Sequence, residues 1–327
     1  MADSMGDDTQ APMLLGISGG LLLISILLLH ARLWSRARPI SNLGLDDWTV
    51  FAATILVMAK YFLVCVACAY GFGRRAKFVP LENRSKSLRL IFICQVLWFW
   101  SITLVKLSVA LLLVRLKPTR CWRIFLFSIM GVLILNAIMA TCFQFLQCRP
   151  FSLYWDPSVF RKGGIECVPR SAITGNIIAG SAVHVSTDLI FSFMPITFIR
   201  KLTRPRREKI FLGILMGLGL FAALFAILRT VGLQNYYTSK DVYRTSVMPT
   251  LWSMLEQEVA LIAATIPTLK SFMERALVKM GQFFYDENTE THVRQKLVEL
   301  GFLELNEKDS QPQFGTKEDR KPSKRGI

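Results

Sequence analysis

The sequence has few charged residues for its length, and it lacks two motifs that mark many soluble enzymes. Only 19% of its 327 residues are Asp, Glu, Lys or Arg, whereas 52% are hydrophobic. A typical soluble domain carries about 25% charged residues. The chain also has no nucleotide-binding loop and no His-Glu-x-x-His zinc motif. These absences argue against the corresponding soluble enzymes and favour a membrane protein.

The charge that is present is strongly basic, with a formal net charge of +16. No zinc-finger, RNA-binding or helix-turn-helix pattern accompanies it, so we expect no nucleic-acid partner. Lys and Arg lie mostly in the gaps between apolar runs, where they would face lipid headgroups and set the topology. Membrane lipid is therefore the first expected partner.

Seven apolar segments are long enough to cross a bilayer, which requires about 20 residues each. Backbone groups in lipid must bond internally, and the alternation of a membrane barrel is absent, so each segment is predicted to be a helix. The sequence therefore predicts an all-α membrane protein, a bundle of seven transmembrane helices. The predicted spans are 13–34, 47–70, 88–115, 122–146, 172–199, 208–230 and 247–272.

The first apolar run is interpreted as a helix of the bundle, because acidic residues precede it and no small-residue cleavage site follows. With the N-terminus outside, the inner connections hold 13 Lys and Arg in 35 residues, against 12 in 60 outside. The positive-inside rule then predicts an outer N-terminus and a cytoplasmic C-terminus, in the plasma membrane or an endomembrane.

The predicted organisation has four parts. Residues 1–12 form an outer N-terminus, 13–273 the membrane domain, 274–305 a cytoplasmic segment with an amphipathic helix, and 306–327 a disordered tail. The densest basic cluster, 200–209, is either an anchor on anionic lipid or a docking site for a cytoplasmic signalling partner.

Several ionisable residues fall inside the apolar runs, where they cost several kcal/mol and usually face the bundle interior. Opposite charges in one bundle should pair, and we expect Lys106 to pair with Asp188 or Glu256. The pair would either fix helix packing or form part of a site for a polar ligand or ion. The ionisable candidates are Lys60, Lys106, His184, Asp188, Arg229, Glu256 and Glu258.

His184 precedes Asp188 by four residues, so both lie on one helix face. No spacing supplies a third ligand, and no metal site is predicted. Cys148 and Cys167 share the connection between the fourth and fifth spans, which is outside in this topology and permits a disulfide. Asn83 begins an Asn-Arg-Ser sequon so close to the next span that we expect it to be unused.

Short signatures in a fixed order carry a family resemblance. They are Asp46-Asp47-Trp48, Tyr70-Gly71-Phe72-Gly73-Arg74, Lys106-Leu107-Ser108, Gln147-Cys148-Arg149-Pro150, Tyr154-Trp155-Asp156, Cys167, Asp188, Leu228-Arg229, Leu251-Trp252-Ser253 with Glu256, and Ile266-Pro267-Thr268-Leu269. Over roughly residues 14 to 273 the chain resembles the fungal rhodopsin-like seven-helix membrane proteins. That family includes receptor-like proteins of plant-pathogenic fungi and membrane proteins encoded beside natural-product genes, such as the satratoxin cluster.

The resemblance adds Trp252 to the candidate ligand or ion-pair residues. Glu258 departs from the pattern, because the family is usually neutral there, so a pair of acids facing the bundle is expected. A retinal pigment needs a lysine midway along the seventh helix, whereas Lys270 stands at the inner end of that span. We therefore expect no retinal and no other cofactor.

Two functions from different classes remain open. The first is a receptor-like protein that senses a small ligand and meets a cytoplasmic partner through its basic inner loops. The second is a membrane-embedded enzyme or accessory protein of a fungal secondary-metabolite cluster, in which Asp188, Glu256 or Glu258 would act as a general acid on a lipophilic intermediate. We regard a non-enzymatic role as the leading hypothesis.

Overall fold

The computed structural model describes residues 9–37, 44–116, 119–155, 165–199, 206–236 and 242–269. All of them belong to one compact unit, Met1–Lys270. The predicted amphipathic segment 274–305, the tail 306–327 and most of the basic cluster 200–209 lie outside the described residues.

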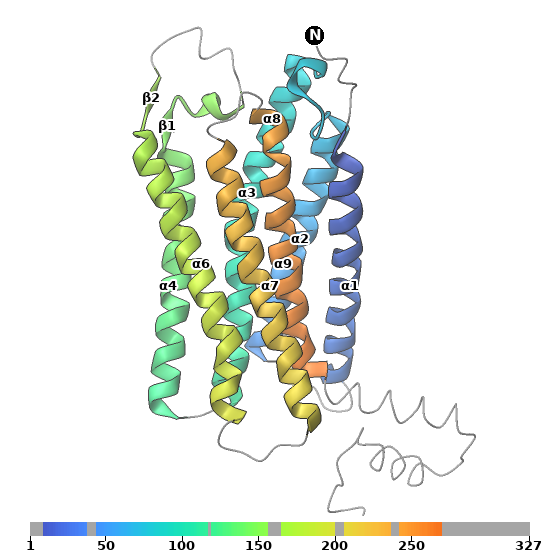
Figure 1. Ribbon diagram of the computed structural model, residues 1–327, viewed down its shortest axis with the longest axis vertical. Coiled ribbons are helices and arrows are strands. Elements are labelled where there is room, and N and C mark those ends of the chain that lie inside the picture. Colours follow the sequence, from blue (N-terminus) through green and yellow to red (C-terminus); the bar gives the residue numbers. More distant parts are fainter. Residues whose placement is uncertain are drawn as a thin grey trace, which may run out of the picture. The chain divides into compact units, whose positions relative to one another are not determined.

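Seven long helices run side by side along this unit (Figure 1). Short elements connect them: the 3₁₀ turns η1 (Ala76–Phe78), η2 (Phe151–Tyr154) and η3 (Ile266–Leu269), the helical turn α8 (Val242–Thr245), and the strands β1 (Cys148–Arg149) and β2 (Glu166–Cys167). The long helices are α1 (Ala11–Ala37), α2 (Leu45–Ala69), α3 (Leu81–Leu116), α4 (Arg120–Leu146), α6 (Arg170–Ile199), α7 (Arg206–Tyr236) and α9 (Val247–Thr265).

Six of these helices, α1 to α4, α6 and α7, are long and apolar enough to cross a membrane. The seventh, α9, does not meet that criterion, because the run Glu256-Gln257-Glu258 in its middle lowers its hydropathy. Almost all of its side chains are buried, and it packs against α1, α2, α3 and α7. Protein rather than lipid therefore surrounds the polar run, and that α9 is a seventh span stays a prediction.

Two helix bounds differ from the prediction by seven residues: α9 ends at Thr265 rather than 272 and is followed by η3, and α3 begins at Leu81 rather than 88. In α3 the helix starts before the apolar stretch, in polar residues. The exposed ion pair of Glu82 with Lys86, four residues apart, stabilises this N-terminal part of α3. Asn83 consequently lies within the first turn of α3. The expectation that its sequon is unused remains a prediction.

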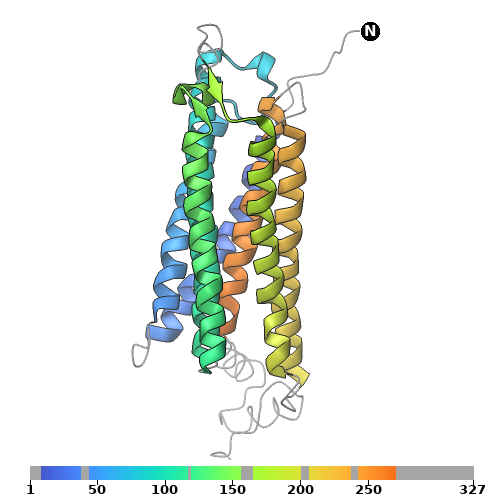
Figure 2. The ribbon, with the colours of Figure 1, turned by 90° about the vertical axis from the view of Figure 1, so that its left-hand side faces the viewer.

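One end of the bundle, here called the disulfide end, carries β1 and β2 (Figure 2). The two strands pair antiparallel with Cys148 opposite Cys167, and these cysteines form a disulfide, as predicted. Five aromatic rings pack together near this disulfide and hold the connection between α4 and α6 against α3 and α4. They are Phe92, Phe145, Phe151, Tyr154 and Trp155.

The same end holds the turn after α2, where Gly71 and Gly73 have φ of +96° and +101°. Side chains other than glycine rarely adopt that conformation, and the carbonyl of Gly73 accepts a hydrogen bond from the backbone of Gln10. Nearby, Tyr243 on α8 shares a 2.7 Å hydrogen bond with Ser87 on α3. Burial raises the pKa of Tyr243, so the hydroxyl stays protonated and can donate. These contacts join the residue before α1 to the turn after α2, and α8 to α3.

Candidate functional site

Lys106 on α3 forms the first part of a polar layer in the middle of the bundle. Its ammonium lies 3.0 Å from Oδ1 of Asp188 on α6, so of the two partners predicted for Lys106 the structure selects Asp188. It also donates to the carbonyl of His184 at 2.8 Å and to the hydroxyl of Thr187 at 3.1 Å. Three oxygen partners match the three hydrogens of the ammonium, which offsets the loss of water around a buried charge.

His184 lies in this layer but has no free face for a metal. Its Nδ1 is 3.4 Å from the ammonium of Lys106, and its Nε2 is 3.3 Å from the side-chain amide of Asn136 on α4. The Asn136 atom at this distance is Nδ2, which donates to Nε2 in the tautomer that carries the ring hydrogen on Nδ1. Among the described residues no three His, Cys, Asp or Glu side chains gather as metal ligands.

Arg229 on α7 and Glu256 on α9 form a second buried ion pair, with Nε of Arg229 3.1 Å from Oε2 of Glu256. The guanidinium also stacks over the indole of Trp98, whose ring centroid lies 4.0 Å from Cζ. The ring of His184 is another neighbour of this indole, 5.2 Å away between centroids. Trp98 therefore connects the two ion pairs of the layer.

Lys60 on α2 is a third buried cation, and its hydrogen-bond partners are neutral. It donates to Ser253 Oγ at 2.9 Å and to Gln257 Oε1 at 2.8 Å, both on α9. The amide nitrogen of Gln257 in turn donates to the hydroxyl of Ser101 on α3. A chain of polar contacts thus crosses from α2 through α9 to α3.

Glu258 and Trp252 occupy different positions from the ion pairs. Glu258 is fully buried, and neither carboxylate oxygen has a hydrogen-bond partner within the described part of the chain. Glu256 and Glu258 thus both lie inside the bundle, but only Glu256 is paired with a cation. The ring of Trp252 stacks on Phe225 of α7, 5.7 Å between centroids, so its observed contact is packing between α7 and α9.

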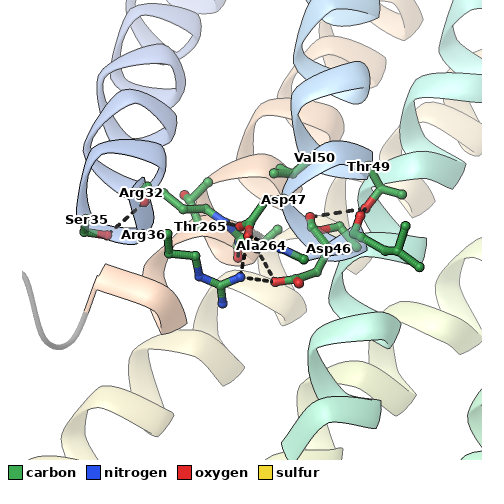
Figure 3. A network of polar contacts seen from close by, with 12 residues as sticks. Arg32, Ser35, Arg36, Asp46, Asp47, Thr49, Val50, Ala264 and Thr265 are labelled. Carbon is green, nitrogen blue, oxygen red and sulfur yellow. Dashed lines mark hydrogen bonds and ion pairs between the residues drawn. The ribbon is translucent and has the colours of Figure 1, made fainter. Parts of the chain in front are cut away.

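A second charged network lies at the opposite end of the bundle, here called the Arg32 end (Figure 3). Arg32 is fully buried and reaches Asp46 Oδ2 and Asp47 Oδ1, each at 2.7 Å. Arg36 contacts the same two carboxylates, at 2.7 and 2.6 Å. Two cations and two anions balance, so the network holds no spare charge.

The Arg32 network joins four helices. Nη1 of Arg32 donates to the carbonyl of Ala264 in the last turn of α9, at 2.7 Å. The final carbonyls of a helix have no partner within it and carry partial negative charge, which a cation satisfies. From α3, the hydroxyl of Ser108 donates to the backbone carbonyl of Asp46 at 2.7 Å.

Sequence reasoning identified Asp46 and Asp47 only as a family signature and missed their pairing with Arg32 and Arg36. A signal for the pairing was present. The arginines stand four residues apart at the end of one predicted span, and the adjacent aspartates open the next span after a short connection. A short connection keeps the two span ends at the same membrane depth, so the arginines and the aspartates are expected to pair.

The contacts of the two networks indicate different roles. At the Arg32 end Arg32 and Arg36 each contact both aspartates, and Arg32 also caps α9, which indicates a role in holding the helices together. The middle layer contains two ion pairs together with Lys60 and Glu258, and several of its polar atoms have no partner within the described residues. These atoms include Asp188 Oδ2, Glu256 Oε1, Arg229 Nη2, Trp98 Nε1 and both oxygens of Glu258. Such an arrangement can take up further hydrogen bonds from a ligand.

Comparisons with known proteins agree with this architecture. The family model described as the fungal rhodopsin domain matches residues 31–275. No solved structure matches the chain.

Among curated relatives, Wortmanamides biosynthesis cluster protein C of Talaromyces wortmannii is 24% identical over 72% of this chain and 63% of its own length. The Polyenoic acids biosynthesis gene cluster protein Ba17b of Metarhizium anisopliae is 22% identical, over 77% of this chain and 71% of its own. Receptor GIN3 of Arthrobotrys oligospora is 21% identical, over 73% and 57%. The chain thus spans about 60 to 70% of the length of these relatives.

Proposed function

Because this chain belongs to the family of the fungal rhodopsin domain, we propose that it is a receptor-like seven-helix membrane protein that senses a small ligand. Its apolar helices and its family make it an integral membrane protein. The observation that carries the proposal is the polar layer of paired charges in the middle of the bundle. Ionisable groups at that depth are costly, and they are usually retained where they line a site.

The proposal includes an orientation of the chain in the membrane. With α9 as the seventh span, an odd number of crossings places the termini on opposite sides, and the excess of Lys and Arg in 31–46, 115–123 and 200–209 assigns the Arg32 end to the cytoplasm. The ligand would then reach the layer from the disulfide end or from the membrane. The basic cluster 200–209 would meet a cytoplasmic signalling partner. The name of one relative, Receptor GIN3, supports this hypothesis.

Ligand-dependent recruitment of a G-protein subunit tests the proposal. The full chain, with a luminescent donor at its C-terminus, is expressed beside an acceptor-labelled Gα subunit and exposed to fractions of fungal culture extract. We expect at least one fraction to raise energy transfer, and Asp188→Asn to abolish the rise at equal surface expression. Glu82→Gln, an exposed carboxylate in the same helical bundle, is the matched control. No response to any fraction, or an undiminished response in Asp188→Asn, would contradict the proposal.

A second function is supported by two relatives that are named for biosynthesis clusters and by the unpartnered carboxylate of Glu258. An acid without a partner can donate a proton to a lipophilic intermediate. Glu258→Gln in the native host, followed by metabolite profiling, separates the two functions. Accumulation of one defined precursor with intact signalling would favour the enzyme.

A further inference from the structure

The ion pair of Arg229 and Glu256 is only half formed. Its one contact joins Nε to Oε2, whereas Nη2 of the guanidinium and Oε1 of the carboxylate have no hydrogen-bond partner in the described residues. Arginine–carboxylate pairs are frequently bidentate, with two parallel bonds. Both side chains are buried, with 5% and 0% exposure, so bulk water does not serve the free atoms. The pair therefore leaves one donor and one acceptor unused between α7 and α9.

The indole of Trp98 adds a second donor beside this pair. Its Nε1 is buried and has no partner among the described residues, and the guanidinium of Arg229 stacks on its ring. Cation–π attraction stabilises the guanidinium in this orientation, which offsets the missing second bond to Glu256. Two N–H donors and one carboxylate oxygen without partners in the described residues thus belong to three side chains that contact one another, from α3, α7 and α9.

The charge balance of the layer restricts what can bind there. Arg229 is paired with Glu256 and Lys106 with Asp188, and all four side chains are at most 7% exposed. A charged head group would leave one charge uncompensated in a low-dielectric interior, which is costly. A carboxylate would also repel Glu256, and an ammonium would repel Arg229.

On the premise of the ligand-sensing function above, we propose that Arg229, Glu256 and Trp98 bind a neutral head group of the carboxamide type. Its carbonyl oxygen accepts from Arg229 Nη2 and Trp98 Nε1, and its N–H donates to Glu256 Oε1. An ester offers only the acceptor and leaves Oε1 of Glu256 without a partner.

Four probes that share one alkyl chain test the head group: oleamide, methyl oleate, oleate and oleylamine. The purified full chain is placed in lipid nanodiscs, and each probe is equilibrated by dialysis against empty nanodiscs, which corrects for partition into lipid. One additional hydrogen bond to a charged group corresponds to about tenfold in affinity. We expect oleamide to bind about tenfold tighter than methyl oleate, and tighter than either charged probe.

Variants then assign the binding to the two donors. Arg229→Lys keeps the positive charge but has no second N–H arm, and Trp98→Phe keeps a ring but loses the N–H. Both should weaken the binding of oleamide several-fold, whereas Glu82→Gln should leave it unchanged. Size-exclusion profiles check folding, and Trp98→Phe preserves the test if Arg229→Lys fails to fold.

The head-group assignment is overturned if methyl oleate or a charged probe binds as tightly as oleamide, if oleamide does not bind, or if Trp98→Phe leaves the affinity for oleamide unchanged. Each of these results leaves the sensing function standing when a culture fraction still drives Gα recruitment through Asp188. Loss of that recruitment response in the wild type would instead remove the premise.

Discussion

Replacing Arg32 tests whether the network at the Arg32 end stabilises the bundle. In Arg32→Met the aspartates Asp46 and Asp47 stay buried, with 4% and 1% exposure, but only Arg36 and, 4.0 Å from Asp46, the exposed Arg115 remain near them. Ala264 also loses the donor to its carbonyl. Removing one partner of a buried ion pair costs about 3–5 kcal/mol, because the remaining charge is left without compensation.

A loss of that size should lower the apparent melting temperature on the order of 10 °C. The measurement is the fraction of detergent-solubilised protein that stays monodisperse after heating. Arg115→Met is the matched control, because Arg115 lies 4.0 Å from the same carboxylate of Asp46 but its side chain is 53% exposed. An exposed pair contributes only about 0–1 kcal/mol.

The two variants remove the same charge from the same end of the molecule, so general changes in solubility or detergent binding should affect both. If Arg32→Met melts within about 2 °C of Arg115→Met, the buried network does not stabilise the bundle as the contacts indicate. A further check is Arg32→Lys, which retains the charge but cannot reach two carboxylates and a carbonyl in one fork. It should fall between the wild type and Arg32→Met.

Three other substitutions have defined outcomes in the same melting assay. Lys106→Met should cost about 3–5 kcal/mol by leaving Asp188 buried without its cation, and adding Asp188→Leu should recover part of the loss. Cys167→Ser should cost about 3 kcal/mol for a bridge to Cys148 across 19 residues, and reducing agent should lower the wild type to the same temperature while leaving the variant unchanged. Gly219→Ala should cost about 1–3 kcal/mol because the new methyl group would collide with the hydroxyl of Ser192, and Ser192→Ala should relieve it; additive losses would refute the collision.

The sequence by itself determined that this protein lies in a lipid bilayer, and it determined the approximate length of its helices. Apolar runs longer than about 20 residues can be satisfied only in lipid, and lipid permits only backbone that bonds to itself, so seven helices were predicted, and six of them are long and apolar enough to cross a membrane. The disulfide of Cys148 and Cys167 was also predicted, because both cysteines lie in one connection that the predicted topology places outside. The family followed from the order of its short signatures.

The sequence did not determine which buried charges meet. Lys106 had two acids at suitable depth, and only the packing of α3 against α6 placed it on Asp188 rather than Glu256. The stacking of Arg229 on Trp98 likewise depends on how α7 and α3 are rotated about their axes. Hydropathy records depth along the membrane normal but not the direction in which a side chain points across the bundle.

The same limit explains α9. Its run Glu256-Gln257-Glu258 keeps it from being apolar enough to count among the candidate membrane spans, yet it is the most thoroughly enclosed of the described long helices, because α1, α2, α3 and α7 surround it. A polar residue is tolerated at membrane depth when other helices, not lipid, cover it. Which helix takes that central place, and hence where the polar layer forms, is decided by contacts between segments far apart in the chain, and only the tertiary structure contains them.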